Sequence, residues 1–117
     1  MNLQEMVRAL RAAAKAEAAA VINRDGAIVA SDLPPAVSAE TFSIMCAAIL
    51  GAGMTASTEL RHPPPHRVLL ESEEATILIQ EIGRRAMVVL VVPAEQSLAN
   101  LEGVISRFAQ AAAEDLD

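Results

Sequence analysis

Residues 42–54 read FSIMCAAILGAGM and contain no charged side chain. Ser38 and Thr41 stand just before this stretch and favour the start of a helix, which we expect to run to about Ser57. A helix whose side chains are apolar or small on all sides needs cover on all sides. A single sheet covers one side only, so we expect the other side to meet something else, most economically a second copy of the chain.

The chain before this helix is expected to form another helix and a β-hairpin. Apolar residues recur at helical spacing over residues 3–14, and Asn2 is a suitable N-cap. Residues 18–23 and 27–31 are mostly apolar, and the sequence Arg-Asp-Gly at 24–26 separates them. Asp-Gly supplies the positive φ angles that tight hairpin turns need, so the two segments are predicted to be antiparallel strands.

Three strands and a helix are expected after the charge-free helix. Pro63-Pro64-Pro65 predicts a stiff connector, and residues 66–71, 75–82 and 86–92 then alternate with turns. Proline beside a strand is typical of a sheet edge, which is where we place the first of the three. The third is apolar at consecutive positions and is expected at the centre of the sheet. Ser97 can cap a last helix, whose buried stripe is Leu98, Leu101, Val104, Ile105, Phe108, Ala109 and Ala112.

The order of elements is therefore helix, two strands, helix, three strands, helix, which indicates an α+β fold with an antiparallel sheet. The 117 residues are expected to form one domain, spanning 1–117. No internal repeat or long linker divides the sequence.

Composition excludes several classes of function. The net charge is −6 and the basic residues are scattered, so we expect no nucleic-acid partner. The charged N-terminal residues do not fit a secretion signal, and no apolar run is expected to reach the length of a membrane span, so we expect no membrane insertion. Cys46 is the only cysteine, which excludes an internal disulfide and favours a reducing cytoplasm.

Motifs for catalysis, metals and cofactors are weak. Gly51-Ala52-Gly53 lacks the Lys and Ser or Thr that a phosphate-binding loop requires. Cys46 sits among apolar residues and is expected to be buried and structural rather than nucleophilic. His62 and His66 have the spacing of helical zinc ligands, but the three prolines between them forbid a helix. We expect no catalytic residue, no metal and no cofactor, and hence no enzyme.

Two segments carry a resemblance to a known family. They are VINRDGAIVA at residues 21–30 and ILIQEIGRRAMVVL at residues 77–90, in the order of elements given above. Together they resemble the Roadblock family, which includes dynein light chains, and the resemblance covers nearly the whole chain. It implies a Roadblock-like (profilin-like) fold: a five-stranded antiparallel sheet, with the second helix on one face and the first and third on the other.

The resemblance also implies a homodimer and a partner. In this family two copies join through the strand after the second helix, here Arg67, Val68, Leu69, Leu70 and Glu71, while the second helices pack together, here around Ile44, Ala48, Gly51, Ala52 and Thr55. Members characteristically bind Ras-like small GTPases as activators, anchors or scaffolds. Arg84 and Arg85, on an exposed turn, are candidate partner contacts, although a solvated turn is the commoner role of such a pair.

Two other functions compete with a GTPase platform. A ligand-sensing module of profilin-like or PAS-like fold would need a cavity with a few convergent polar groups, and this core offers short aliphatic side chains with almost none. A small hydrolase would have only Cys46 as a nucleophile. A non-enzymatic, self-associating platform is the function that the sequence favours.

Overall fold

The computed structural model describes residues 1–116, and it contains the eight predicted elements with small shifts at their ends. The elements are α1 (Leu3–Ala14), β1 (Ala18–Asn23), β2 (Ile28–Asp32), α2 (Ala39–Glu59), β3 (Arg67–Glu71), β4 (Ala75–Ile82), β5 (Ala86–Pro93) and α3 (Leu98–Leu116). The predicted domain also includes Asp117, which lies outside the described residues.

The five strands form one antiparallel sheet in the order β2-β1-β5-β4-β3. The central position predicted for residues 86–92 is confirmed, since every residue of β5 except Pro93 is buried. The edge position predicted for the strand after the prolines is confirmed as well, since β3 is the last strand of the sheet.

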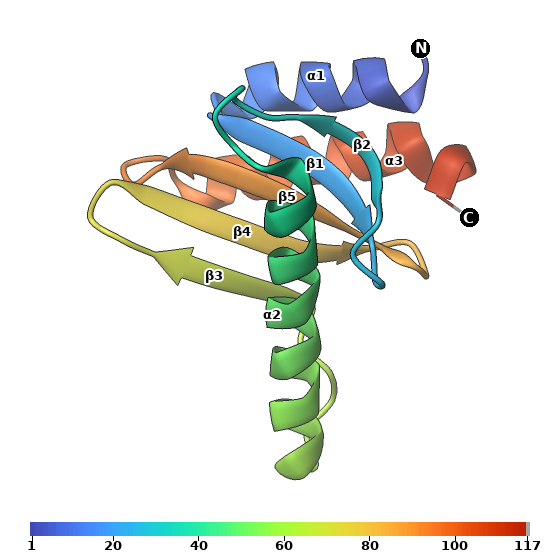
Figure 1. Cartoon of the computed structure of the whole chain (residues 1–117), viewed down its shortest axis with the longest axis vertical. Helices are drawn as coiled ribbons and strands as arrows, with labels where there is room; N and C mark the ends of the chain where they lie inside the picture. The colour runs from blue at the N-terminus through green and yellow to red at the C-terminus, as the bar shows by residue number, and fades with distance from the viewer. Residues whose placement is uncertain (117) are drawn as a thin grey trace.

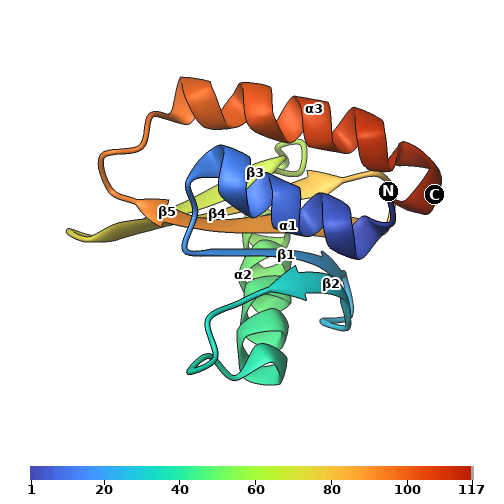
Figure 2. The ribbon, with the colours of Figure 1, turned by 90° about the horizontal axis from the view of Figure 1, so that it is seen from above.

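Helices cover both faces of the sheet, as the fold class predicts (Figures 1 and 2). On one face, α1 and α3 cover an apolar core that includes Val7, Leu90 and Phe108. On the other face α2 crosses the strands, and Cys46 and Leu50 pack there against a second, smaller core. The α+β sandwich therefore has two helices on one side and a single helix on the other.

Local sequence explains where the elements begin and turn. The Asn2 side chain accepts a hydrogen bond from the Glu5 backbone N–H, and the Glu5 carboxylate accepts one from the Asn2 N–H, which fixes the start of α1. In the β1–β2 turn, Asp25 accepts from the Ala27 N–H and Gly26 has a φ of +94°. A residue with a side chain rarely adopts that φ, so the Asp-Gly pair sets this turn.

The expectation that no apolar segment reaches the length of a membrane span is wrong for α2. Its 21 residues include a window with a mean hydropathy of 1.4, so the helix is long and apolar enough to cross a membrane by length and composition. Length and composition do not distinguish such a span from a helix that packs against protein. In this fold α2 buries Ser43, Cys46 and Leu50 on its inner side, where it packs against the sheet.

Candidate functional site

Helix α2 runs across the sheet and continues past the outer edge of β3. Near its start, Ile44 packs beside the β1–β2 turn, where a Cβ on Gly26 would lie 3.2 Å from Cγ1 of Ile44. Farther along, a Cβ on Gly53 would lie 3.6 Å from Cγ2 of Val68 in β3. Met54 still packs against the core beneath α2, whereas the residues after it have little sheet beneath them, and Figure 1 shows this last part of α2 projecting as an arm.

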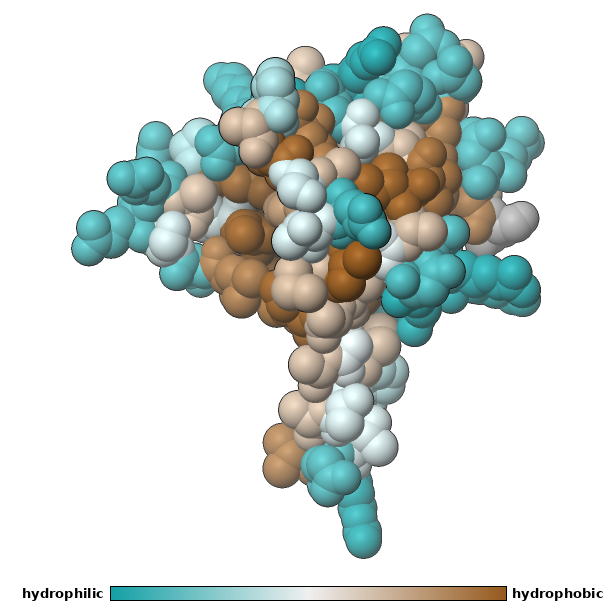
Figure 3. Space-filling model, viewed as in Figure 1, coloured by the Kyte–Doolittle hydropathy of each residue, from teal (hydrophilic) through white to brown (hydrophobic). Residues whose placement is uncertain are grey.

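The outer side of α2 is exposed along its length. Only Ser43, Cys46 and Leu50 of this helix are buried. Ile44 is 44% exposed and Met45 is 52% exposed, and Leu60, directly after the helix, is 69% exposed. In Figure 3, α2 is a column of brown, tan and white residues with teal at its tip. The chain thus leaves an apolar helix face uncovered, as a helix without charges on any side predicts.

The residues predicted to contact a second copy lie on this open side. Ile44, Ala48, Gly51, Ala52 and Thr55 are all exposed, and a Cβ on Gly51 would meet nothing within 4 Å. The Thr55 hydroxyl donates to the Gly51 carbonyl at 3.1 Å, inside the helix. Because this hydroxyl already has a partner, another protein can cover the face without leaving it unpaired.

Strand β3 borders the arm and is paired with β4 on one side only. Its side chains alternate: Val68 packs in the core beneath α2, and Leu69 packs on the face covered by α1 and α3. Leu70 is 39% exposed. Arg67 turns towards α3, where its Nη1 lies 3.1 Å from the Glu102 carboxylate. Arg67 therefore ties β3 to α3, while the backbone of the outer edge and the side chain of Leu70 remain exposed.

Arg84 and Arg85 are exposed on the turn between β4 and β5, next to the β1–β2 turn. The Arg24 backbone N–H donates to the Arg85 carbonyl at 3.1 Å. Asn23, Arg24, Asp25 and Arg85 line a hollow of about 330 Å³ at this end of the sheet. The two turns thus form one polar surface.

Sequence reasoning missed Arg24, which links this polar end of the sheet to α2. Its guanidinium pairs with the Glu81 carboxylate, and its Nη1 lies 3.7 Å from the Met54 sulfur. These partners are 57 and 30 residues away in the chain. The only local signal was a basic residue directly before the Asp-Gly turn.

The family model for the Roadblock/LC7 domain matches residues 2–92, which include α1, α2, β1 to β4, and β5 as far as Val92. This chain belongs to the Roadblock/LC7 domain family. The family resemblance, which was based on residues 21–30 and 77–90, is therefore confirmed. Helix α3 lies beyond the residues that the family model matches.

Solved structures show the same fold at low sequence identity. MglB of Myxococcus xanthus has a TM-score of 0.86 at 12% identity, over 97% of this chain and 96% of MglB. A Roadblock/LC7 domain of Streptomyces avermitilis has a TM-score of 0.87 at 13% identity, over 99% and 98% of the two chains. Profilin II of Acanthamoeba castellanii has a TM-score of 0.63 at 16% identity, over 97% and 98%, which agrees with the profilin-like description.

Curated relatives of this Roadblock/LC7 domain include an uncharacterized protein of Methanocaldococcus jannaschii. It is 33% identical over 70 residues, which are 60% of this chain and 59% of the relative. The chain thus spans about three fifths of the length of the curated relatives it matches.

Cys46 of the Roadblock/LC7 domain is buried in the core between α2 and the sheet. Burial raises the pKa of its thiol from 9.0 to about 11, so the thiol remains protonated at neutral pH. The predicted burial of Cys46 is confirmed. His62 and His66 are exposed, and within residues 1–116 no group of three or more His, Cys, Asp or Glu side chains could hold a metal ion.

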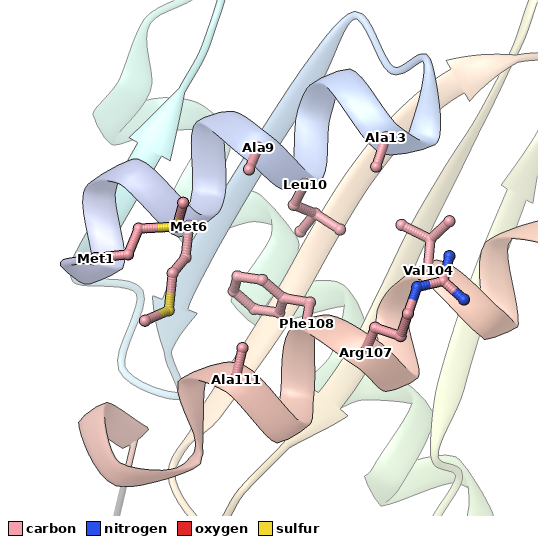
Figure 4. A pocket seen from close by; sticks show the side chains of 9 residues that line it. All are labelled: Met1, Met6, Ala9, Leu10, Ala13, Val104, Arg107, Phe108 and Ala111. Carbon is pink, nitrogen blue, oxygen red and sulfur yellow. The ribbon is translucent and has the colours of Figure 1, made fainter.

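A groove of about 190 Å³ lies between α1 and α3, on the side of the sheet away from α2 (Figure 4). Its lining residues are Met1, Met6, Ala9, Leu10, Ala13, Val104, Arg107, Phe108 and Ala111. Arg107 is the only polar side chain among them. A ligand-sensing site needs several polar groups that converge on the ligand, and this groove does not supply them.

Proposed function

We propose that this Roadblock/LC7 domain forms a homodimer that acts in the cytoplasm as a regulatory or docking platform for a Ras-like small GTPase. One observation carries the proposal: the exposed outer side of α2, apolar near its start, runs beside a free sheet edge, and the end of the helix projects past that edge. Both features lie on the same side of the molecule, so a single partner can cover both.

A second copy fits this arrangement. If the two β3 strands pair antiparallel, the second sheet continues the first and lies beneath the projecting part of α2. The arm of each copy then covers part of the other, which is the reciprocal contact of a two-fold interface. The backbone hydrogen bonds of two edge strands and the apolar area of α2 both favour association.

The position of Gly53 over β3 affects how the two helices meet. The two-fold axis would pass beside β3, so the helices would cross near the residues that follow Gly53. Of the predicted contacts, Thr55, Ala52 and Gly51 would then lie nearest to the crossing. Ile44, about three turns before the crossing, would lie towards the far end of the partner's arm.

The GTPase part of the proposal is supported by family membership. Members of this family characteristically bind Ras-like GTPases, and the only cysteine is buried with a raised thiol pKa, so we expect action by contact. Such contact could order the switch elements of the GTPase, or it could supply an arginine to the transferring phosphoryl group. Arg84 and Arg85 are exposed on a turn and are the candidates for that contact.

The experiment first asks whether a Ras-like GTPase is encoded near this gene, and it pairs this chain with such a GTPase. Retention of the GTPase in its GDP and GTP states is measured first, followed by the rate of GTP hydrolysis. An activator should prefer the GTP state and raise the rate, whereas a scaffold should bind without changing the rate. Absence of binding in both states would contradict the proposed partner.

Variants separate the role of the two arginines. Arg84→Ala with Arg85→Ala should lower retention or the rate if they touch the GTPase. Arg8→Ala is the matched control, because Arg8 is an exposed arginine on α1, which covers the opposite face of the sheet from α2. If both variants retain the GTPase and affect its rate of GTP hydrolysis as the parent does, Arg84 and Arg85 do not contact the GTPase and are only solvated turn residues.

A further inference from the structure

The two edge strands of the sheet, β2 and β3, differ in whether side chains of a helix bind along them. Strand β2 forms the edge opposite β3. Two side chains of α1, Gln4 and Arg11, reach this edge, and seven residues place them on the same side of the helix. Within residues 1–116, no comparable side-chain hydrogen bond reaches the backbone of β3.

Gln4 binds the backbone of Ser31 in the way that a neighbouring strand would. Its Nε2 donates to the Ser31 carbonyl at 2.7 Å, and its Oε1 accepts from the Ser31 N–H at 3.2 Å. One side-chain amide therefore occupies both backbone groups of this residue. A residue of an edge strand offers the same donor and acceptor to an incoming strand, so Gln4 takes the place of that strand.

Two further features hinder pairing along β2. Arg11 donates through Nη1 to the Asp32 carboxylate at 2.9 Å and lies 3.4 Å from the Asp32 carbonyl. Towards the turn, the register between β1 and β2 shifts between Val21 and Ile22, which makes the strand irregular. One end of β2 is thus held by α1 side chains, and the other end is irregular.

We propose that Gln4 caps the β2 edge and thereby confines sheet-edge association of this domain to β3. Pairing of β2 with β3 of another copy would be head-to-tail and would grow into an open chain of sheets. Pairing of β3 with β3 closes after two copies. The β3 dimer rests on the proposed function, whereas the capping of β2 rests on the Gln4 and Arg11 contacts alone.

The test compares the full chain with the Gln4→Ala variant. Alanine is a better helix former than glutamine, and the Asn2–Glu5 capping pair is unchanged, so α1 should remain intact. Exchange of the Ser31 amide hydrogen should become about tenfold faster, as expected when a hydrogen bond of ordinary strength is lost. Light scattering should show species heavier than those of the parent, in proportions that grow with protein concentration.

Three more variants keep the test specific. Gln4→Met preserves the length of the side chain without its amide and should behave like Gln4→Ala. Gln110→Ala, an exposed glutamine on α3, should match the parent. Adding Val29→Lys to Gln4→Ala should remove the heavier species, because Val29 is an exposed residue of β2 and a charge on an edge strand discourages pairing.

Two results would contradict the proposal that Gln4 caps the β2 edge. One is unchanged exchange of the Ser31 amide hydrogen in both Gln4 variants, and the other is faster exchange without any species heavier than those of the parent. A monomeric parent protein would contradict the proposed β3 dimer instead. A monomeric parent would not affect the test of Gln4, because the mass of each Gln4 variant is compared with the mass of the parent.

Discussion

Gly26 joins two parts of the fold, the β1–β2 turn and the start of α2. Its φ is +94°, and an added Cβ would lie 3.2 Å from Cγ1 and 3.3 Å from Cα of Ile44. The residue therefore needs both the conformational freedom of glycine and its small size. The sequence predicted the first need from the Asp-Gly pair. The second depends on Ile44 and appears only in three dimensions.

Gly26→Ala should lower the free energy of unfolding by about 1–2 kcal/mol or more, because it adds backbone strain to a close contact. Urea unfolding measures the change. Gly103→Ala is the matched control: Gly103 is helical, and its added Cβ would make an ordinary 3.5 Å contact with the Arg107 guanidinium. The control should be neutral or slightly stabilising. Equal stability of the two variants would contradict the close packing of α2 on the turn.

Cys46 gives a pH dependence with a definite sign. Its pKa is raised from 9.0 to about 11 in the folded chain, so the unfolded chain loses this proton first. The contribution of the protonated thiol to stability is complete below pH 9 and is lost as the pH rises towards 11, by roughly 2 kcal/mol.

Unfolding of the parent and of Cys46→Ala should be followed over this alkaline range. Cys46→Ala leaves a small cavity but has no thiol to ionise, so its stability should fall less steeply. Identical slopes for the two proteins would show that Cys46 does not carry the effect. The sequence predicted that this cysteine is buried because its neighbours are apolar.

Among the helices and strands, α2 shows that the sequence could predict where an element begins and ends without predicting which side of it faces the sheet. Ser38 marked its start correctly, and the expected end at Ser57 lies two residues before the observed end at Glu59. The side that faces the sheet could not be predicted, because residues 42–54 carry no charged side chains and so form no polar stripe that would orient the helix. The placement of Gly53 over Val68, and hence the projecting arm, became visible only in the structure.

Gly51→Leu tests whether the open side of α2 contacts another copy. The folded chain has free space at this position and leucine favours a helix more than glycine does, so the monomeric variant should unfold at a similar or slightly higher urea concentration. In the proposed dimer the larger side chain separates the helices, and the dissociation constant should rise about tenfold or more. Sedimentation at several concentrations measures it.

The control for this variant places the same side chain elsewhere. Ala12→Leu adds a leucine at an exposed position of α1, which covers the opposite face of the sheet. Its dissociation constant should equal that of the parent. If Gly51→Leu also equals the parent, the exposed face of α2 is not the interface.

At the scale of the whole molecule, the order of elements and the central β5 followed from strong local signals: continuous apolar residues in β5, the Asp-Gly turn, and prolines before β3. The placement of the helices on the two faces followed from the family resemblance. The binding of Gln4 to the β2 edge and the ion pair between Arg24 and Glu81 could not be predicted. Both join residues far apart in the chain, and the residues involved show no distinctive local pattern.

The molecular mass of the chain in solution shows whether two copies of this domain associate. One copy has a mass of 12.3 kDa. Light scattering across the micromolar range should give twice that value, falling towards the single mass on dilution. A mass of one copy at every concentration would contradict the account, because the arm of α2 and the free edge of β3 would then remain uncovered.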